Sequence, residues 1–176
     1  GFILPREPAM LDVILDLYRH MEWADAEQWR ALLAHGPARE DAELRERLVH
    51  LHGAQSIWLG RFQGLPSPPR WPTPADYPRI EDLRHYAGAC HAAFRAWLPT
   101  VKAADLDRVL TFRTLAGDEV SQTLGDGLMQ VPLHSHYHRG QHATRMRALG
   151  GAMPTTDWAL WARKGRPAAQ WPEVAK

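Results

Sequence analysis

The sequence has almost no cysteine, no long hydrophobic run and no excess of charge of one sign. Its single cysteine, Cys90, excludes an intrachain disulfide and fits a reducing compartment. No apolar run approaches the ~20 residues of a transmembrane helix. The 21 basic and 20 acidic residues leave a formal net charge of +1, without the footprint of a nucleic-acid or anionic-membrane binder. We therefore expect a cytoplasmic protein with no nucleic-acid and no membrane partner.

The N-terminus also lacks the pattern of a secretory signal. We expect no signal peptide, because four residues interrupt its apolar stretch: Pro5, Arg6, Glu7 and Pro8. The chain begins with Gly1, so the position of the native start stays open. A length of 176 residues is enough for one domain with a hydrophobic core. We predict a single domain over residues 1–176.

What the sequence does contain is four long segments with apolar residues at three-and-four spacing, which is typical of amphipathic helices. Gly36 suits a left-handed position after the first segment, and Asp41 suits the N-cap of the second. Pro99 ends the third, and Gly150 with Gly151 ends the fourth. Such segments predict an all-α four-helix bundle. The predicted helices span roughly residues 10–34, 41–63, 80–98 and 124–149.

Three shorter segments connect or follow these helices. The stretch VLTFRTLAGDEVSQTL, residues 109–124, has two β-favouring runs around an Ala-Gly-Asp turn and predicts a short β-hairpin before the last long helix. The stretch TTDWALWARK, residues 155–164, predicts a short C-terminal helix held by Trp158 and Trp161. Residues 64–79 predict an ordered, non-helical connection, because they hold six prolines: Pro66, Pro68, Pro69, Pro72, Pro74 and Pro78.

Histidines are concentrated in LHSHYHRGQHATRMRALGG, residues 133–151. On a helix, His134 and His138 share one face with Cβ atoms ~5–6 Å apart, so both can reach one metal ion. His136 points away from them, and His142 has drifted by ~80° and is a weaker candidate. An imidazole on a core-facing stripe needs a partner, since burying an unpaired polar group costs ~1–3 kcal/mol. A metal ion would serve two rings at once.

A third ligand has to come from another helix, because catalytic zinc-type centres usually have three protein ligands. The second helix offers His50 and His52, which diverge by about 200°, so only one of them faces the core. Periodicity with Leu48 and Leu51 slightly favours His52 and leaves the choice open. His-x3-His pairs also arise by chance, so a solvated helix face is the alternative interpretation of these histidines.

Other polar residues have simpler expected roles. Glu22, Asp25 and Glu27 are the nearest candidates for a general base, but a solvated first-helix face is the role that we expect for them. Arg139 and Gln141 are expected to support neighbouring side chains rather than to catalyse. The remaining histidines are expected on the surface or as hydrogen-bonded structural residues: His20, His35, His85 and His91.

Three stretches, in order along the chain, resemble the DinB/YfiT family of metal-dependent proteins. HSHYHRGQHATRMRALGGAMPTTDWALWAR, residues 134–163, resembles its pattern of His, three residues and His-Arg-Gly-Gln, then a glycine stop, a proline and an aspartate before the last helix. LVHLHGAQSIWLGRFQG, residues 48–64, resembles its second-helix pattern of a histidine eight residues before a tryptophan. MEWADAEQWRALL, residues 21–33, resembles its first-helix Trp-Ala-Asp stretch.

This resemblance implies a four-helix bundle with up-down-down-up connectivity that is often a homodimer. It also implies a divalent metal ion, commonly nickel, zinc or iron, held by three histidines. Carried over by position, these are His50, His134 and His138, where the spacing to Trp58 selects His50 over His52. The motif thus outweighs the slight preference from periodicity.

One departure from the family pattern is Pro132, two residues before His134. Proline removes a backbone donor, so it would kink the helix or mark its first turn. That would change the geometry of the site and leave the identity of the ligands intact.

The implied site has a recognisable chemistry. Three neutral imidazoles leave the charge of a divalent ion uncompensated, and an open position would hold water with its pKa lowered towards ~7, a thiolate or a substrate carbonyl. The resemblance therefore implies a metal-dependent enzyme, a thiol-dependent S-transferase or a hydrolase, acting on a small molecule such as a low-molecular-weight thiol. The alternative is a non-catalytic metal-binding bundle that serves as a structural or stress-response module.

Overall fold

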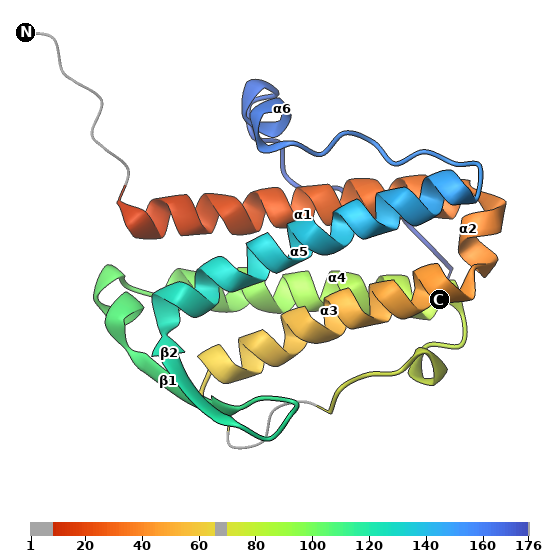
Figure 1. Ribbon diagram of the computed structural model, residues 1–176. Coiled ribbons are helices and arrows are strands. Elements are labelled where there is room, and N and C mark those ends of the chain that lie inside the picture. Colours follow the sequence, from red (N-terminus) through yellow and green to blue (C-terminus); the bar gives the residue numbers. More distant parts are fainter. Residues whose placement is uncertain (1–8, 66–69, 176) are drawn as a thin grey trace, which may run out of the picture.

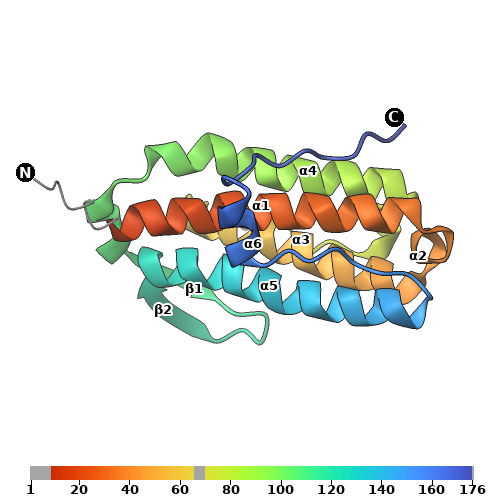
Figure 2. The same ribbon diagram turned by 90° about the horizontal axis from the view of Figure 1, so that it is seen from above.

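The computed structural model describes residues 9–65 and 70–175. The four long helices α1, α3, α4 and α5 lie side by side and enclose the core (Figures 1 and 2). In Figure 1, α1 and α5 run in one direction, and α3 and α4 run in the other. The N-terminal residues 5–8, on which the expectation of no signal peptide rests, lie outside the described residues, as do Pro66, Pro68 and Pro69. The observed ranges agree with the predicted ones to within one residue: α1 Met10–Ala34, α3 Ala42–Phe62, α4 Ile80–Trp97 and α5 Leu124–Ala148.

The helix ends follow from local chemistry. The side chain of Asp41 accepts a hydrogen bond from the backbone N–H of Leu44 at 2.7 Å and caps α3, as predicted. Thr123 caps α5 in the same way through the N–H of Asp126, at 3.1 Å. Gly150, with φ 79°, takes the left-handed conformation that ends α5.

The prediction for Gly36 is wrong. Gly36 does not end α1 in a left-handed conformation but begins a short helix, α2 (Gly36–Glu40), with Pro37 in its first turn. The chain turns instead at His35, whose φ of −114° and ψ of 107° are extended. The physical reason is that the fixed φ of proline suits the first helical turn as well as it suits a helix stop.

The hairpin forms as predicted. Strands β1 (Val109–Arg113) and β2 (Glu119–Thr123) pair antiparallel, with Val109 opposite Thr123 and Arg113 opposite Glu119. Gly117, with φ 92°, provides the turn. Leu110 is buried against the end of the bundle, so the hairpin closes that end. The connections also hold 3-10 turns, one of them in the proline-rich stretch predicted to be non-helical: η1 Pro74–Asp76, η2 Leu98–Thr100 and η3 Ala103–Asp107.

Inside the bundle, two apolar clusters are separated by a layer of buried polar side chains. One cluster lies at the hairpin end and includes Tyr18, Phe62 and Phe94. The other lies at the α2 end and includes Trp29 and Leu44. Between them along the four helices come the polar residues: Asp25 of α1, His52 and Gln55 of α3, His91 of α4, and Ser135, Arg139 and His142 of α5.

The C-terminal part of the chain crosses α1 and returns along the bundle. Helix α6 (Trp158–Arg163) lies over α1, and the segment after it runs back beside α1 and α4 (Figure 2). Trp161 is fully buried against Trp23 and Ala24, and this contact fixes α6 as the tryptophan pattern predicted. The backbone carbonyl of Thr156 bonds His20 at 2.8 Å.

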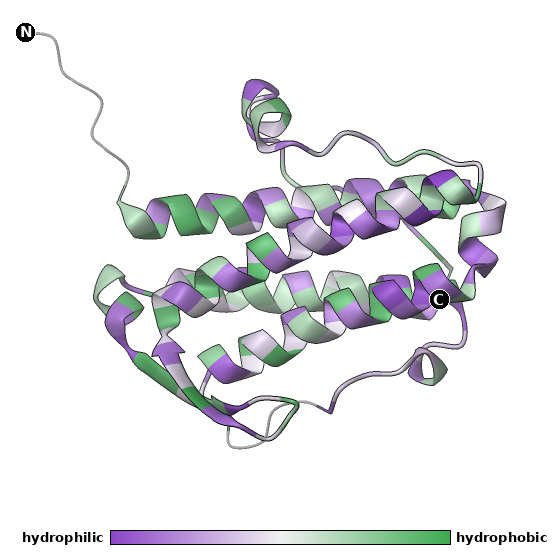
Figure 3. Ribbon diagram, viewed as in Figure 1, coloured by the Kyte–Doolittle hydropathy of each residue, from purple (hydrophilic) through white to green (hydrophobic). Residues whose placement is uncertain are grey.

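Polar and apolar residues alternate along each long helix (Figure 3). This alternation is the pattern of helices that bury one face and leave the other in water. In the part of the chain that the structure describes, no helix is both long and apolar enough to cross a membrane.

Candidate metal centre

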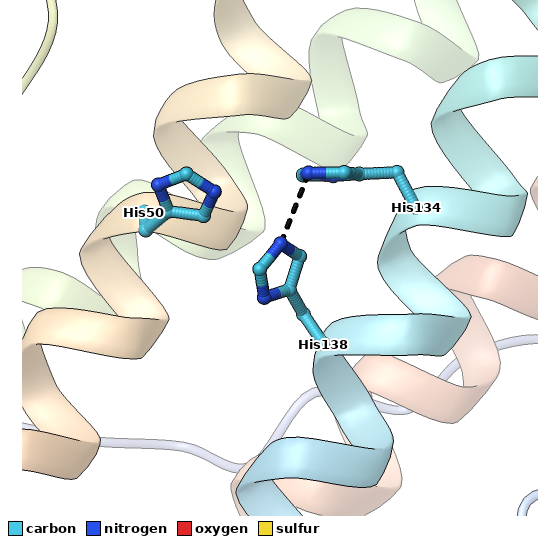
Figure 4. A group of neighbouring side chains, drawn as sticks. All are labelled: His50, His134 and His138. Atoms are coloured by element: carbon cyan, nitrogen blue, oxygen red, sulfur yellow. Dashed lines mark hydrogen bonds between the residues drawn. The ribbon is translucent and has the colours of Figure 1, made fainter.

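The three histidines carried over from the motif meet between two helices. His50 projects from α3, and His134 and His138 project from successive turns of α5 towards it (Figure 4). One possible ligand nitrogen from each ring lies within 4.8 Å of the others. All three side chains are half-buried, so the group lies at the surface of the bundle rather than in its core.

The rings of His134 and His138 are in direct contact. Their Nε2 atoms are 3.0 Å apart, and the ring of His50 lies 4.6 Å from that of His138 between centroids. Tetrahedral coordination at the usual Zn–N distance of ~2.0–2.1 Å requires ligand nitrogens ~3.3 Å apart. Small ring movements would bring the three nitrogens to that spacing.

Gln141 fixes the orientation of His138. Nδ1 of His138 bonds the side-chain oxygen of Gln141 at 2.8 Å, so this nitrogen carries the proton and Nε2 keeps its lone pair. That lone pair faces His134. A hydrogen bond at the far nitrogen is the usual support of a histidine ligand, and it matches the supporting role expected for Gln141.

The electrostatic surroundings keep the three rings neutral. Burial, and then the neighbouring His138 and His50, together lower the pKa of His134 to about 4. Burial also lowers the pKa of His50 and of His138 below the ordinary value. Because a metal ion binds only unprotonated imidazole, this set of donors is ready for a cation at neutral pH.

The proline-rich connection forms a wall beside His50. The ring of Trp71 lies 5.2 Å from that of His50 between centroids. Pro72 packs so closely on Gly53 of α3 that a Cβ atom there would lie 2.7 Å from Cγ of Pro72. A larger residue at position 53 would displace this wall, which the sequence showed only as a glycine three residues after His50.

Pro132 does not mark the first turn of the helix. Helix α5 runs without a break from Leu124 to Ala148 and carries Pro132 in its interior. His136 is exposed on the opposite side from the group. His142 is fully buried, and one of its ring nitrogens, Nε2, has no partner among the described residues.

His52 lies in the core and not beside the other three. Its Nε2 accepts a hydrogen bond from Nε1 of Trp29 at 3.0 Å, and its Nδ1 donates to Gln55 at 2.9 Å. It forms a second group of possible ligands with Asp25 and His91, all fully buried. Both nitrogens of His52 are thus already in use.

The charge beside this second group is the opposite of what a cation needs. Nη1 of Arg139 donates to Asp25 at 2.8 Å, and Nε2 of His91 donates to the other carboxylate oxygen at 2.8 Å. Burial alone would raise the pKa of Asp25, but His91 and Arg139 together lower it below its usual range. The group is therefore a hydrogen-bonded ion pair in which the guanidinium takes the place that a metal would need.

These observations correct the expectation of a solvated first-helix face. Asp25 is 2% exposed and Glu22 is 7% exposed, and only Glu27 keeps substantial contact with water. The signal was present in the sequence, since Asp25 falls four residues after Met21 and four before Trp29 on the apolar stripe of α1. Arg139, which sits on the core line of α5, is its partner.

The comparisons with known proteins agree with the motif. The model of the DinB family matches residues 10–168, which is most of the chain. A search of curated proteins found no match to the sequence of this chain.

Proposed function

Because the chain belongs to the DinB family, we propose that it is a metal-dependent enzyme whose divalent ion is held by His50, His134 and His138. The observation that carries the proposal is the meeting of three neutral imidazoles from two helices at a half-exposed position. Nickel, zinc and iron all accept imidazole ligands, so the donor set fits the metals that the family resemblance implies.

The half-exposed position favours a catalytic over a purely structural ion. Structural zinc sites are closed by four protein ligands, whereas catalytic sites keep a position open for water or substrate. A bound ion here would supply a Lewis acid that lowers the pKa of a bound water or thiol. The residues of the chain would hold that ion, with Gln141 orienting His138 and Trp71 walling one side.

The charge of the donor set supports an anionic substrate group. Three neutral imidazoles contribute no negative charge, so a divalent ion would attract a thiolate or a hydroxide to its open position. We therefore propose a thiol-dependent S-transferase acting with a low-molecular-weight thiol, with a hydrolase as the second candidate. An ion bound there would also join α3 to α5, which supports the alternative of a non-catalytic, structural or stress-response metal site.

The metal content of the purified protein tests the site directly. We expect near-stoichiometric nickel, zinc or iron by plasma mass spectrometry, lost in His50→Ala, His134→Ala and His138→Ala. The matched control is His136→Ala, which removes an exposed histidine of the same helix and should keep the metal. A protein that neither contains metal nor binds added nickel or zinc through these histidines would overturn the proposal.

A second readout separates catalysis from structure. The metal-loaded protein should bind a small thiol with a change in the d–d absorption of a substituted Co²⁺ or Ni²⁺ ion. A spectrum that stays unchanged at saturating thiol, with metal still bound, would favour the structural alternative.

Two further proposals come from the family resemblance. The helix directions in Figure 1 support the up-down-down-up connectivity. A homodimer is proposed on the resemblance alone, and light scattering of the purified protein measures its mass. A cytoplasmic location is proposed from the single cysteine and the composition.

A further inference from the structure

A cavity of about 670 Å³ lies away from the two helices that carry the histidine group. It is lined by α1, by α4 with the turn after it, and by residues 166–169 of the returning C-terminal segment. Small-molecule sites typically measure ~300–1,000 Å³, so this volume is sufficient for a ligand of moderate size. The function proposed above does not use it.

The floor of the cavity is apolar. Leu15 of α1 and Phe94 and Leu98 of α4 and its C-terminal turn line it, and Phe94 and Leu98 belong to the core. Two buried polar side chains, Tyr18 and His91, also border it. His91 is held from behind by Asp25, so this part of the wall is rigid.

Positive charge exceeds negative charge around the cavity. Three arginines line it, against two carboxylates: Arg19, Arg95 and Arg166 against Asp16 and Glu22. Each of the three arginines is paired with one of the two carboxylates, so the rim carries one net positive charge. Asp16 accepts from Arg19 at 2.9 Å and from Arg166 at 2.7 Å, and Glu22 accepts from Arg95 and from Nε1 of Trp171.

The outer wall is fixed by hydrogen bonds to the backbone of residues 166–169 and of the residues just after them. Nε1 of Trp161 donates to the carbonyl of Pro167 at 3.0 Å. Arg30 donates to the carbonyl of Gln170 at 2.6 Å, and Arg84 donates to that of Pro172 at 2.9 Å. A wall held in this way keeps the cavity formed without a ligand, which is the usual state of binding sites.

We propose that this cavity binds a small amphipathic carboxylate, with its apolar tail over Leu15, Phe94 and Leu98 and its carboxylate at the arginine rim. The apolar floor provides the affinity, and the excess positive charge selects an anion over a neutral molecule of the same shape.

Calorimetric titration with octanoate tests the proposal, with 1-octanol as the neutral ligand of equal chain length. The protein is first freed of metal with a chelator, so that carboxylate binding to an ion at the histidine group cannot contribute. Failure here and failure of the metal proposal are thus separate results. We expect octanoate to bind and 1-octanol to bind several-fold more weakly.

Two variants locate the binding. Ala168→Trp places a large side chain in the cavity from an exposed position and should abolish octanoate binding while the thermal unfolding curve stays cooperative. Arg95→Gln should weaken octanoate by about three- to fivefold, because interactions of exposed charges are modest, and should leave 1-octanol unchanged. The control, Arg163→Gln, changes an exposed arginine outside the cavity. Equal binding of the two ligands, or octanoate binding that survives Ala168→Trp, would overturn the proposal.

Discussion

The bundle holds two groups of metal-type ligands that differ mainly in what surrounds them. His50, His134 and His138 lie half-buried between α3 and α5, with neutral rings. Asp25, His52 and His91 lie fully buried between the two apolar clusters. Both groups bring their ligand atoms within 4.8 Å, so proximity alone does not distinguish a metal site from a hydrogen-bond network.

The neighbours of each group make the difference. In the buried group, Arg139 supplies the positive charge, and Trp29 and Gln55 occupy both nitrogens of His52. In the half-buried group, none of the cationic side chains that the structure describes is hydrogen-bonded to a ring, and two imidazole nitrogens face each other. A buried charge has to be paired by its own protein, whereas a half-exposed set of neutral donors is free to take an ion from solution.

The largest expected effect comes from breaking the buried group. Asp25→Asn keeps the shape of the side chain but leaves the buried guanidinium of Arg139 unpaired, and we expect stability to fall by ~3–5 kcal/mol. Urea unfolding measures that loss. The protein that stays folded should keep its metal content, because Asp25 is not part of the half-buried group. Metal loss with unchanged stability would instead identify the buried group as the metal site.

The features that depend on residues close together in the sequence were predictable, and the contacts between distant residues were not. The long helices, their caps at Asp41 and Gly150 and the hairpin follow from local patterns, and the structure confirms them. The choice between His50 and His52 did not follow from periodicity, because periodicity favours the core-facing histidine, and the structure buries His52 in the core while the half-buried His50 joins the metal-type group. The motif spacing to Trp58 favoured His50, and the structure brings His50 to His134 and His138.

The partners across the bundle were not predictable in this way. Asp25 and Arg139 are 114 residues apart, and no local pattern records that they meet. The same holds for Trp71, which reaches His50 only because the proline-rich connection packs back on Gly53. At Gly36 the local pattern itself was ambiguous, since glycine followed by proline suits both a helix end and a helix start.

An intermediate effect is expected from pH on stability, and it comes from His142 in the layer of buried polar side chains. Burial, and then the nearby His52, lower the pKa of His142 to about 3, against an ordinary value near 6.5. Between pH 6.5 and 3, the unfolded chain therefore binds a proton at this position that the folded chain does not bind. The contribution of His142 to the free energy of unfolding is fully present above pH 6.5 and is lost as the pH falls, by about 2 kcal/mol between pH 7 and 5.

His142→Leu removes this titration. Urea unfolding at pH 7 and pH 5 should show a smaller difference in stability for this variant than for the parent, by that same amount. His136→Leu, at an exposed position of the same helix, is the matched control and should leave the pH dependence unchanged. An equal pH dependence in the parent and in His142→Leu would mean that His142 is protonated in the folded chain.

The smallest expected effect concerns the hydrogen bond from His138 of the half-buried group to Gln141. Gln141→Ala removes the acceptor for Nδ1–H of His138, so the ring loses its fixed orientation, and metal affinity should fall by about tenfold, the lower end of the usual range for such supporting residues. Competition with a chromogenic chelator measures this change. Gln141→Glu offers a stronger acceptor at the same position and should keep or raise the affinity, whereas Gln130→Ala, at an exposed site of α5, should change nothing. A role limited to helix packing would make the alanine and glutamate variants behave alike. A metal affinity that is lower in the alanine variant than in the glutamate variant therefore assigns Gln141 to the metal centre. In the buried group, by contrast, the histidines are held by hydrogen bonds to Trp29, Gln55 and Asp25, which leave no nitrogen of His52 for an ion.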